Sequence, residues 1–281
     1  MNFAYWTLSP NPPCLVTMPN SSNDLRVVLA NRSVADALRS CAMHLGCPVG
    51  FLEQHRVATV ERLGGDERVV RTFVRDAVGL VSIPCEEEVD LGLDLADVQE
   101  LISLTRLGAS PGSVVELRAT RLTISEDPAA VELLDEGTLA PSPKVAGMLV
   151  YDPRRDVLDM LRHDVSADEW NQGGGNLDSP HRVGALQGGV LVALATVDAP
   201  QGRLARIRVL VSPRHRRMGY GRVVLHALVR HVLSQGFIPV VRLAVGDLAA
   251  RALASAVGFV SFARALTLHV TSVDVVVSAE T

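Results

Sequence analysis

A glycine-containing loop between a strand pattern and a helix pattern is the feature that most constrains this chain. Residues 204–211 (LARIRVLV) have the apolar content of a strand, and residues 213–221 follow as PRHRRMGYG. An amphipathic helix pattern then runs from about Gly221 to Gln235. Gly219 and Gly221 let the backbone turn several N–H groups toward one anion, and the helix adds the positive end of its dipole. This order of strand, loop and helix predicts a site for a phosphorylated ligand.

The charge around the loop supports a small anionic ligand. No Asp or Glu occurs between Asp198 and Asp247, and nine arginines lie in that stretch, although the whole chain has a net charge of -4. A nucleic-acid-binding domain usually has a net positive charge and an extended basic stripe. The stretch also has few aromatic residues on which bases could stack. We therefore predict no nucleic-acid partner, with a solvated arginine-rich face as the alternative explanation for the arginines alone.

Composition predicts an ordinary globular protein. The chain has 281 residues, of which 48% are hydrophobic, and its apolar runs are far shorter than the ~18 residues of a membrane span. Residues 1–20 contain four prolines and no positively charged segment, so they do not resemble a secretory signal, and we expect residues 1–23 to be disordered. The four cysteines lack metal-binding spacing, which favours reduced thiols. We predict a cytoplasmic protein with no metal and no membrane association.

The C-terminal part alternates between strand and helix patterns. Ser166, followed three residues later by Glu169, has the spacing of a capping box, and Gln187-Gly188-Gly189 separates two apolar runs as a hairpin turn does. Asp247 and Gly258 flank the last helix pattern as its N-cap and C-cap. The predicted strands are 145–151, 182–186, 190–197, 204–211, 238–245, 259–262 and 266–275, and the predicted helices are 154–162, 167–172, 221–235 and 248–257.

The N-terminal part has weaker patterns. Helices are predicted at 34–45 and 95–107, and strands at 78–83 and 113–124. This half suggests no chemistry by itself. We therefore predict two domains, a smaller α/β domain of unclear type over residues 24–143 and a second domain over residues 144–275. The predicted fold class is α/β (α+β), with a mixed, mostly antiparallel sheet flanked by helices.

Two motifs in the C-terminal part carry a family resemblance. Arg216-Arg217-Met218-Gly219-Tyr220-Gly221 follows a strand that ends at Val209-Leu210-Val211. Downstream, Asp247, Ala250, Leu253 and Gly258-Phe259 keep the spacing of a second motif. About Val145 to Val270, a little under half of the chain, resembles the GNAT superfamily of acyl-CoA-dependent N-acyltransferases. The first motif looks like its pyrophosphate signature, Arg/Gln-x-x-Gly-x-Gly/Ala, and the second like Asn-x-x-Ala-x-x-Leu-Tyr followed by Gly-Phe.

The resemblance implies a GNAT-like fold with acetyl-CoA as cosubstrate. A dinucleotide site fits less well, because no acidic residue ends the strand Ile238–Val245, and the Gly-Lys-Ser/Thr of a phosphate-binding P-loop is missing. In the family, the pantetheine arm lies between two strands that splay apart, and loop amides hold the pyrophosphate. The residues implied for cofactor binding are Val209, Leu210, Val211, Arg216, Arg217, Met218, Gly219, Tyr220, Gly221, Arg222 and Asp247.

The catalytic residues are less clear from the resemblance. Many members carry a Glu on the strand before the loop, but Arg203–Arg208 contains no carboxylate. We take Glu169 as the candidate base or amine-binding residue, with its role in the capping box as the alternative. The tyrosine that commonly protonates the thiolate falls at Ala254, and the usual asparagine is Asp247. Water, another donor or the acceptor's own proton would then have to serve.

Two functions remain open at this stage. The first is an acetyl-CoA-dependent N-acetyltransferase that acts on a primary amine of a small molecule or peptide, with an N-terminal domain that shapes the acceptor site. The second is a CoA-binding sensor or scaffold with little catalytic activity, because Ala254 cannot donate a proton. The resemblance also implies a possible homodimer through exposed C-terminal strands.

Overall fold

The computed structural model describes most of the chain beyond residue 30. The described residues are 31–45, 57–62, 68–76, 78–84, 91, 93–118, 120–125, 129–144, 147–173, 179, 181–198 and 203–273. The predicted disorder of residues 1–23 lies outside them.

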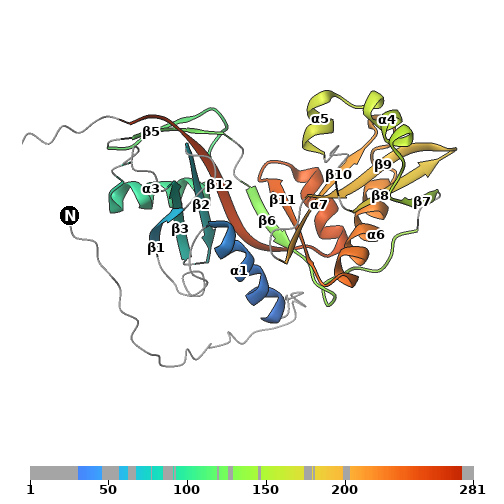
Figure 1. Ribbon diagram of the computed structural model, residues 1–281, viewed down its shortest axis with the longest axis horizontal. Coiled ribbons are helices and arrows are strands. Elements are labelled where there is room, and N and C mark those ends of the chain that lie inside the picture. Colours follow the sequence, from blue (N-terminus) through green and yellow to red (C-terminus); the bar gives the residue numbers. More distant parts are fainter. Residues whose placement is uncertain are drawn as a thin grey trace, which may run out of the picture.

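One twisted sheet runs through the molecule from end to end (Figure 1). Its strand order is β1-β3-β2-β12-β6-β11-β10-β9-β8-β7, and a hairpin of β4 and β5 pairs with β12. β1 with β3 and β10 with β11 are parallel, and every other pair of described strands is antiparallel. The mixed, mostly antiparallel sheet with flanking helices confirms the predicted fold class.

The C-terminal elements follow the sequence prediction closely. The Ser166–Glu169 capping box forms, and Gly188 and Gly189 turn with φ of 58° and 83° between two strands, which fits a type I′ hairpin. The elements are β7 (Met148–Tyr151), α4 (Arg155–Asp164), α5 (Ala167–Gln172), β8 (Arg182–Gln187), β9 (Val190–Val197), β10 (Leu204–Val211), a 3₁₀ turn (Pro213–His215), α6 (Tyr220–Ser234), β11 (Ile238–Ala244) and α7 (Leu248–Val257).

The N-terminal elements were only partly predicted. The predicted strand 113–124 is a hairpin instead, because Leu117 N–H bonds to the Thr120 carbonyl and turns the chain back. β1, β2 and β6 had no counterpart in the prediction. The elements are α1 (Asn31–Leu45), β1 (Val57–Arg62), β2 (Val69–Arg75), β3 (Val78–Pro84), α3 (Leu95–Leu107), β4 (Val114–Glu116), β5 (Thr120–Ile124) and β6 (Ala129–Leu133).

The last strand is one long element where two were predicted. β12 (Val260–Val273) pairs with β6 and then with β5 along one edge, and with β2 along the other. The register is irregular after Ser261, within the pairing with β6, and after Val270, within the pairing with β5. A bulge can bend a strand without ending it, so the chain continues where the pattern suggested a break. Figure 1 shows β12 curving from α7 to the N-terminal strands.

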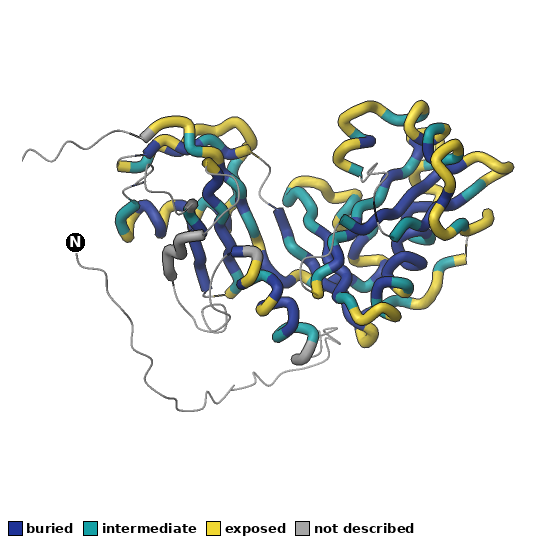
Figure 2. Tube along the Cα trace, in the orientation of Figure 1, coloured by how far each residue is buried: buried dark blue, intermediate teal, exposed yellow. Residues whose placement is uncertain are grey.

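Helices cover both faces of the sheet. α6 and α7 pack on one face through a core that includes Val224, Leu228 and Val257. α4 and α5 pack on the other face, where Leu161 and Trp170 meet residues of β9 and β10. In Figure 2 the buried residues follow the strands and the inner sides of these helices. Within the described residues, no helix is long and apolar enough to cross a membrane.

Helix α1 connects the two parts of the chain. Ala37, Leu38 and Leu45 pack against residues of β2, β3, β6, β11 and β12. The largely buried Asp36 of α1 forms an ion pair with Arg203, at the start of β10. Arg203 also donates to the Gly236 carbonyl at 2.7 Å. α1 therefore holds together the points where β10 and β11 begin, and the sheet runs across the predicted boundary at residues 143 and 144.

We expect Gly258→Ala to destabilise the protein by about 3 kcal/mol. Gly258 has φ of 111°, and a Cβ there would overlap the Thr138 carbonyl oxygen. Gly236→Ala is the matched control, since Gly236 has φ of 78° but nothing within 4 Å of its Cβ position. The control should cost only about 1 kcal/mol from backbone strain. Urea denaturation of both variants measures the difference, and equal losses would contradict this account.

We also expect the free energy of unfolding to fall as the pH drops below about 6.5. Burial lowers the pKa of His226 below 6.5, although its Nε2 donates to the Ala140 carbonyl at 2.9 Å. The unfolded chain therefore binds more protons in this range, and acid favours unfolding. Burial raises the pKa of Glu132, which acts in the opposite sense above pH 4.5. His226→Gln should reduce the loss between pH 7 and pH 5 in urea titrations; an equal loss in the variant would exclude His226 as a source.

Candidate functional site

Two parallel strands separate in the middle of the sheet. β10 and β11 pair at only three positions, Leu204 with Ile238, Ala205 with Pro239 and Arg206 with Val240. Beyond that point residues 207–211 pair only with β9, and residues 241–244 pair only with β6. We call this opening the fork. It has the form that the resemblance predicted for the two strands around the loop.

The backbone of β10 presents alternate residues to the fork. Ser212 N–H bonds to the Val192 carbonyl, and the Arg206 carbonyl accepts from Asp198, so the even-numbered residues of β10 bond to β9. In an antiparallel pair the intervening residues point their N–H and C=O groups the other way. Val209 and Val211 therefore present backbone groups to the fork, and Leu210 presents its groups to β9.

The loop after β10 enters α6 through Gly219 and Tyr220, a left-handed residue followed by a helical one, which is the conformation of an anion nest. Arg217 and Gly219 both have positive φ, 63° and 86°, and Gly219 is the N-cap of α6. Left-handed residues that alternate with right-handed ones turn successive N–H groups to one side. The first N–H groups of α6 also have no carbonyl partner within the helix. The predicted strand-to-helix turn is thus present, and the binding of an anion by its amides stays a prediction.

Helices α6 and α7 pack against each other and against β10 beside the fork. A Cβ at Gly221 would lie 3.2 Å from Val211 Cγ2 and 3.5 Å from Leu253 Cδ2, so a larger side chain would push the strand and α7 away from α6. Arg222, in the same turn of α6, has a buried Nε with no hydrogen-bond acceptor among the described residues. A close backbone approach, open amides and an unpaired guanidinium nitrogen fit a ligand with an extended arm and a diphosphate.

The arginine of the loop is held by the helix that precedes the hairpin. Arg216 Nη2 lies 2.5 Å from Glu169 Oε1, and Arg216 Nε donates to the Val211 carbonyl at 3.3 Å. The Arg216 guanidinium, followed by hydrogen bonds from Ser166, lowers the pKa of Glu169. A lowered pKa makes this carboxylate a weaker base. Glu169, the predicted catalytic residue, therefore lies beside the loop but is engaged by both Arg216 and the α5 cap.

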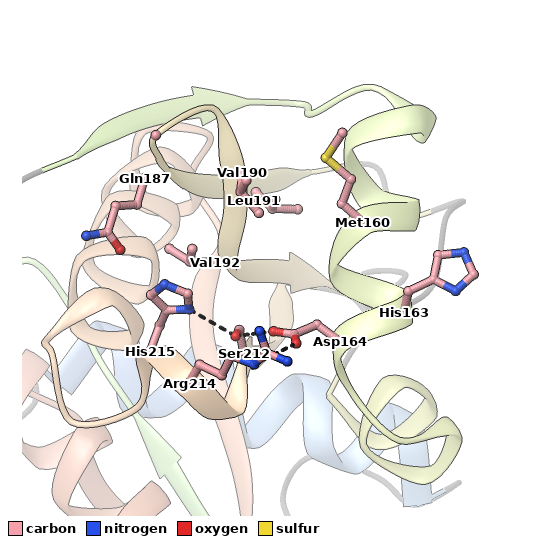
Figure 3. A pocket seen from close by; sticks show the side chains of 11 residues that line it. Met160, His163, Asp164, Gln187, Val190, Leu191, Val192, Ser212, Arg214 and His215 are labelled. Atoms are coloured by element: carbon pink, nitrogen blue, oxygen red, sulfur yellow. Dashed lines mark hydrogen bonds and ion pairs between the residues drawn. The ribbon is translucent and has the colours of Figure 1, made fainter.

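A cavity of about 650 Å³ lies beside the start of the loop (Figure 3). Its lining includes Met160 and Asp164 of α4, Val192 of β9, and Ser212 and His215. The buried Ser212 hydroxyl donates to Asp164, so His215 Nδ1, 3.0 Å away, must donate to Ser212 Oγ. Sequence reasoning missed Ser212 and Asp164, because they lie 48 residues apart and neither belongs to a motif.

The remaining loop residues lie at the surface or in the core. Met218 is 55% exposed, and Arg217 is exposed as well. Tyr220 is buried at the start of α6, with its ring edge-on to His215 at 6.1 Å and next to Gly147 beside β7. The Tyr220 ring therefore points toward the β7 and β8 side of the sheet.

The second motif contributes to the helix that covers the fork. Asp247 caps α7, and its carboxylate accepts from Ala250 N–H at 2.9 Å. This is the capping role that Asp and Asn share. Ala254, on the buried side of α7, is 1% exposed. Its methyl group packs in the core at the position where the resemblance implied a tyrosine.

Two further polar groups, His181 and Glu132, lie outside the loop. His181 Nδ1 lies 3.1 Å from His231 Nε2, near the C-terminal end of α6. The loop is at the opposite end, about 16 Å along the helix axis at 1.5 Å per residue. His181 therefore lies near the end of α6 that is remote from the loop. Glu132 of β6, which sequence reasoning missed, is a buried carboxyl group 4.0 Å from Arg251 of α7.

Metal binding finds no support in the described part of the chain. There, no three His, Cys, Asp or Glu side chains gather as ligands for an ion. Cys41 is a thiol of α1 and belongs to no disulfide.

The comparison with protein families matches the C-terminal half. Residues 149–259 match the model of the acetyltransferase (GNAT) family. This match covers both motifs and confirms the resemblance for this part of the chain. No curated protein matches the sequence at a significant level.

Solved structures of the same family are similar to the chain. A GNAT-family acetyltransferase from Colwellia psychrerythraea has 16% identity and a TM-score of 0.44, over 68% of this chain and 76% of that one. A GCN5-related N-acetyltransferase from Kribbella flavida has 16% identity and a TM-score of 0.41, over 54% and 60%. A tandem GNAT protein from the clavulanic acid biosynthesis pathway has 15% identity and a TM-score of 0.40, over 85% and 94%.

We expect Ser212→Ala to lower the free energy of unfolding by about 1–2 kcal/mol, because it removes a buried hydroxyl and leaves Asp164 and His215 without their shared partner. Ser234→Ala is the matched control, since Ser234 is exposed and donates only to the His231 carbonyl in its own helix. Its loss should stay below about 0.5 kcal/mol. Urea denaturation compares the two, and a larger loss for the control would refute the account.

Proposed function

Starting from the GNAT acetyltransferase domain in the C-terminal half, we propose that the protein transfers an acetyl group from acetyl-CoA to a primary amine. The observation that carries the proposal is the fork between β10 and β11 beside the loop at the N-terminus of α6. A fork exposes strand backbone that would otherwise be paired, and the loop exposes amides that would otherwise be capped. The two together suit a ligand that is both peptide-like and phosphorylated.

The residues that we propose to bind acetyl-CoA have distinct roles. Val209 and Val211 bond the extended arm through their backbone groups. The amides of residues 217–222 hold the diphosphate, and Arg222 adds positive charge. Acetyl-CoA, when bound, supplies an activated thioester carbonyl. The N–H of Val211 is the group we propose to stabilise the negative charge that develops on the carbonyl oxygen.

The proton transfers do not depend on Glu169 in this proposal. Its carboxylate is engaged by Arg216 and Ser166, and its lowered pKa weakens it as a base. We propose that water receives the proton of the acceptor amine and that water also protonates the thiolate, since Ala254 has no proton to donate. A reaction with such unassisted steps should be slow unless the acceptor itself assists.

The N-terminal part is proposed to shape the acceptor site. α1 lies at the closed end of the fork, where Asp36 binds Arg203, and on the same face of the sheet as α5. An acceptor that reaches the fork from this face would meet both helices. The division into domains at residue 144, the cytoplasmic location and the possible homodimer remain parts of the same proposal.

A second candidate function is the binding of CoA without efficient catalysis. Ala254, which is 1% exposed, and the arginines Arg206 and Arg208 of β10 favour it, because none of these three positions carries a tyrosine or a carboxylate that could transfer a proton. Such a protein would bind acetyl-CoA and would not release CoA in the presence of amines.

The first test is calorimetric titration with acetyl-CoA. We expect the wild type to bind and Gly221→Val to lose binding by at least about tenfold, because the new side chain meets Val211 and Leu253 at the fork. Gly112→Ala is the control, since nothing lies within 4 Å of its Cβ position and it belongs to the N-terminal part. Absence of binding to the wild type would end the proposal.

A thiol-release assay then separates the two functions. Acetyl-CoA is incubated with the protein and with amines of several classes, including amino acids, polyamines and peptides. Release of CoA that depends on one amine supports the transferase, and binding without release across the panel supports the sensor or scaffold.

A further inference from the structure

The α4–α5 pair contacts the loop at two points. Asp164, the last residue of α4, accepts a hydrogen bond from Ser212 at the start of the loop. Glu169 of α5 binds Arg216 further along. The pair itself rests on β9 and β10, where Trp170 packs in one cluster with Leu210. The loop and the α4–α5 pair are thus joined by polar contacts and rest on the same apolar residues of β9 and β10.

Helix α5 is held by arginines at both ends. Glu169, in its first turn, binds Arg216 of the loop. Asn171 and Gln172, in its last turn, accept from Arg208 of β10 through their backbone carbonyls at 3.1 and 3.2 Å. Both arginines belong to the continuous segment of β10 and the loop. A shift of this segment would therefore move α5, and a shift of α5 would move the loop.

The Arg216 contacts also bear on the conformation of the nest. Arg217 has φ of 63°, a conformation that costs a residue other than glycine about 1 kcal/mol or more. Such a conformation persists only where its surroundings hold it in place. Arg216, the residue before it, is fixed at both ends of its guanidinium, by Glu169 and by the Val211 carbonyl. Glu169 thereby helps to keep the loop amides in the arrangement that a diphosphate needs.

We propose that Glu169 is a positioning residue that acts through Arg216, presetting the loop for the diphosphate and coupling the loop to α5. The inference rests on the proposed function, because it takes acetyl-CoA as the ligand of the loop. Presetting a binding loop increases affinity by removing the cost of ordering it. Through the same contacts, a ligand bound at the loop changes the position of α5, which lies on the face from which we propose that the acceptor enters.

Calorimetric titration with acetyl-CoA tests the positioning role. We expect Glu169→Gln to raise Kd about threefold to fivefold, the range of a partly exposed ion pair. Ser166→Ala is the matched control: it removes the hydroxyl of the same capping box but leaves the Glu169–Arg216 contact, so Kd should stay at the wild-type value. A purely structural role for Glu169 in the cap would instead make the two variants alike.

A double-mutant cycle shows whether the effect passes through Arg216. In an Arg216→Gln background, Glu169→Gln should change Kd by less than about 1.5-fold, since the partner is already gone. An undiminished effect in that background would overturn the proposal. Tighter binding by Glu169→Gln alone would also overturn it, because Glu169 would then compete with the diphosphate for Arg216.

Trp170 offers a signal from α5 itself. It is 6% exposed and adjoins Glu169, and the chain has two tryptophans, so Trp6→Phe leaves Trp170 as the sole reporter. We expect acetyl-CoA to change the emission of Trp170 in this background, and Glu169→Gln to abolish the change at saturating ligand. An identical change in both proteins would refute the coupling. Failure of the wild type to bind acetyl-CoA would instead refute the proposed function on which the inference rests.

Discussion

Five residues of β6, Ala129–Leu133, fill the position between β11 and β12 through backbone pairing along both of their edges. With β6 in place, β11 has a complete partner on the side away from β10, so it can leave β10 after three residues without exposing both of its edges. β10 in turn keeps β9 as its partner up to Ser212. The fork therefore forms because β10 stays paired with β9 and β11 stays paired with β6. Helix α1 packs at the end of the fork where β10 and β11 still pair.

The loop could be predicted because its information is local. Gly219 and Gly221, the strand before them and the helix after them are contiguous in the sequence, and the structure has the positive φ at Gly219 that such a turn requires. The caps at Ser166, Asp247 and Gly258 belong to the same class, since each acts on residues within four positions of itself. Local backbone chemistry of this kind is what a single sequence encodes most directly.

The parts that the sequence did not predict depend on contacts between distant segments. β6 is only five residues long, and its partners β11 and β12 lie more than a hundred residues later. The two closing strands were predicted separately because nothing local indicates that one strand will exchange β6 for β5 along one edge while it pairs with β2 along the other. The sequence predicted the cap at Ser166. It did not predict the ion pair between Glu169 and Arg216, which lie 47 residues apart. Which residues of β10 direct their backbone groups to β9 is likewise set by the register of the pairing and not by residue type.

The long strand β12 has a consequence for how the chain becomes a folded protein. It supplies partners to β2, β5 and β6, all of which precede it by more than a hundred residues. During synthesis the edges of β2, β5 and β6 that pair with β12 therefore stay open until β12 has emerged, and such edges are prone to pair with other chains. A fragment that begins after β6 would have the same problem from the other side, because β11 and β12 would lack the strand between them. The strands of the two parts of this sequence are thus interleaved, and the sheet is complete only when β12 has joined it.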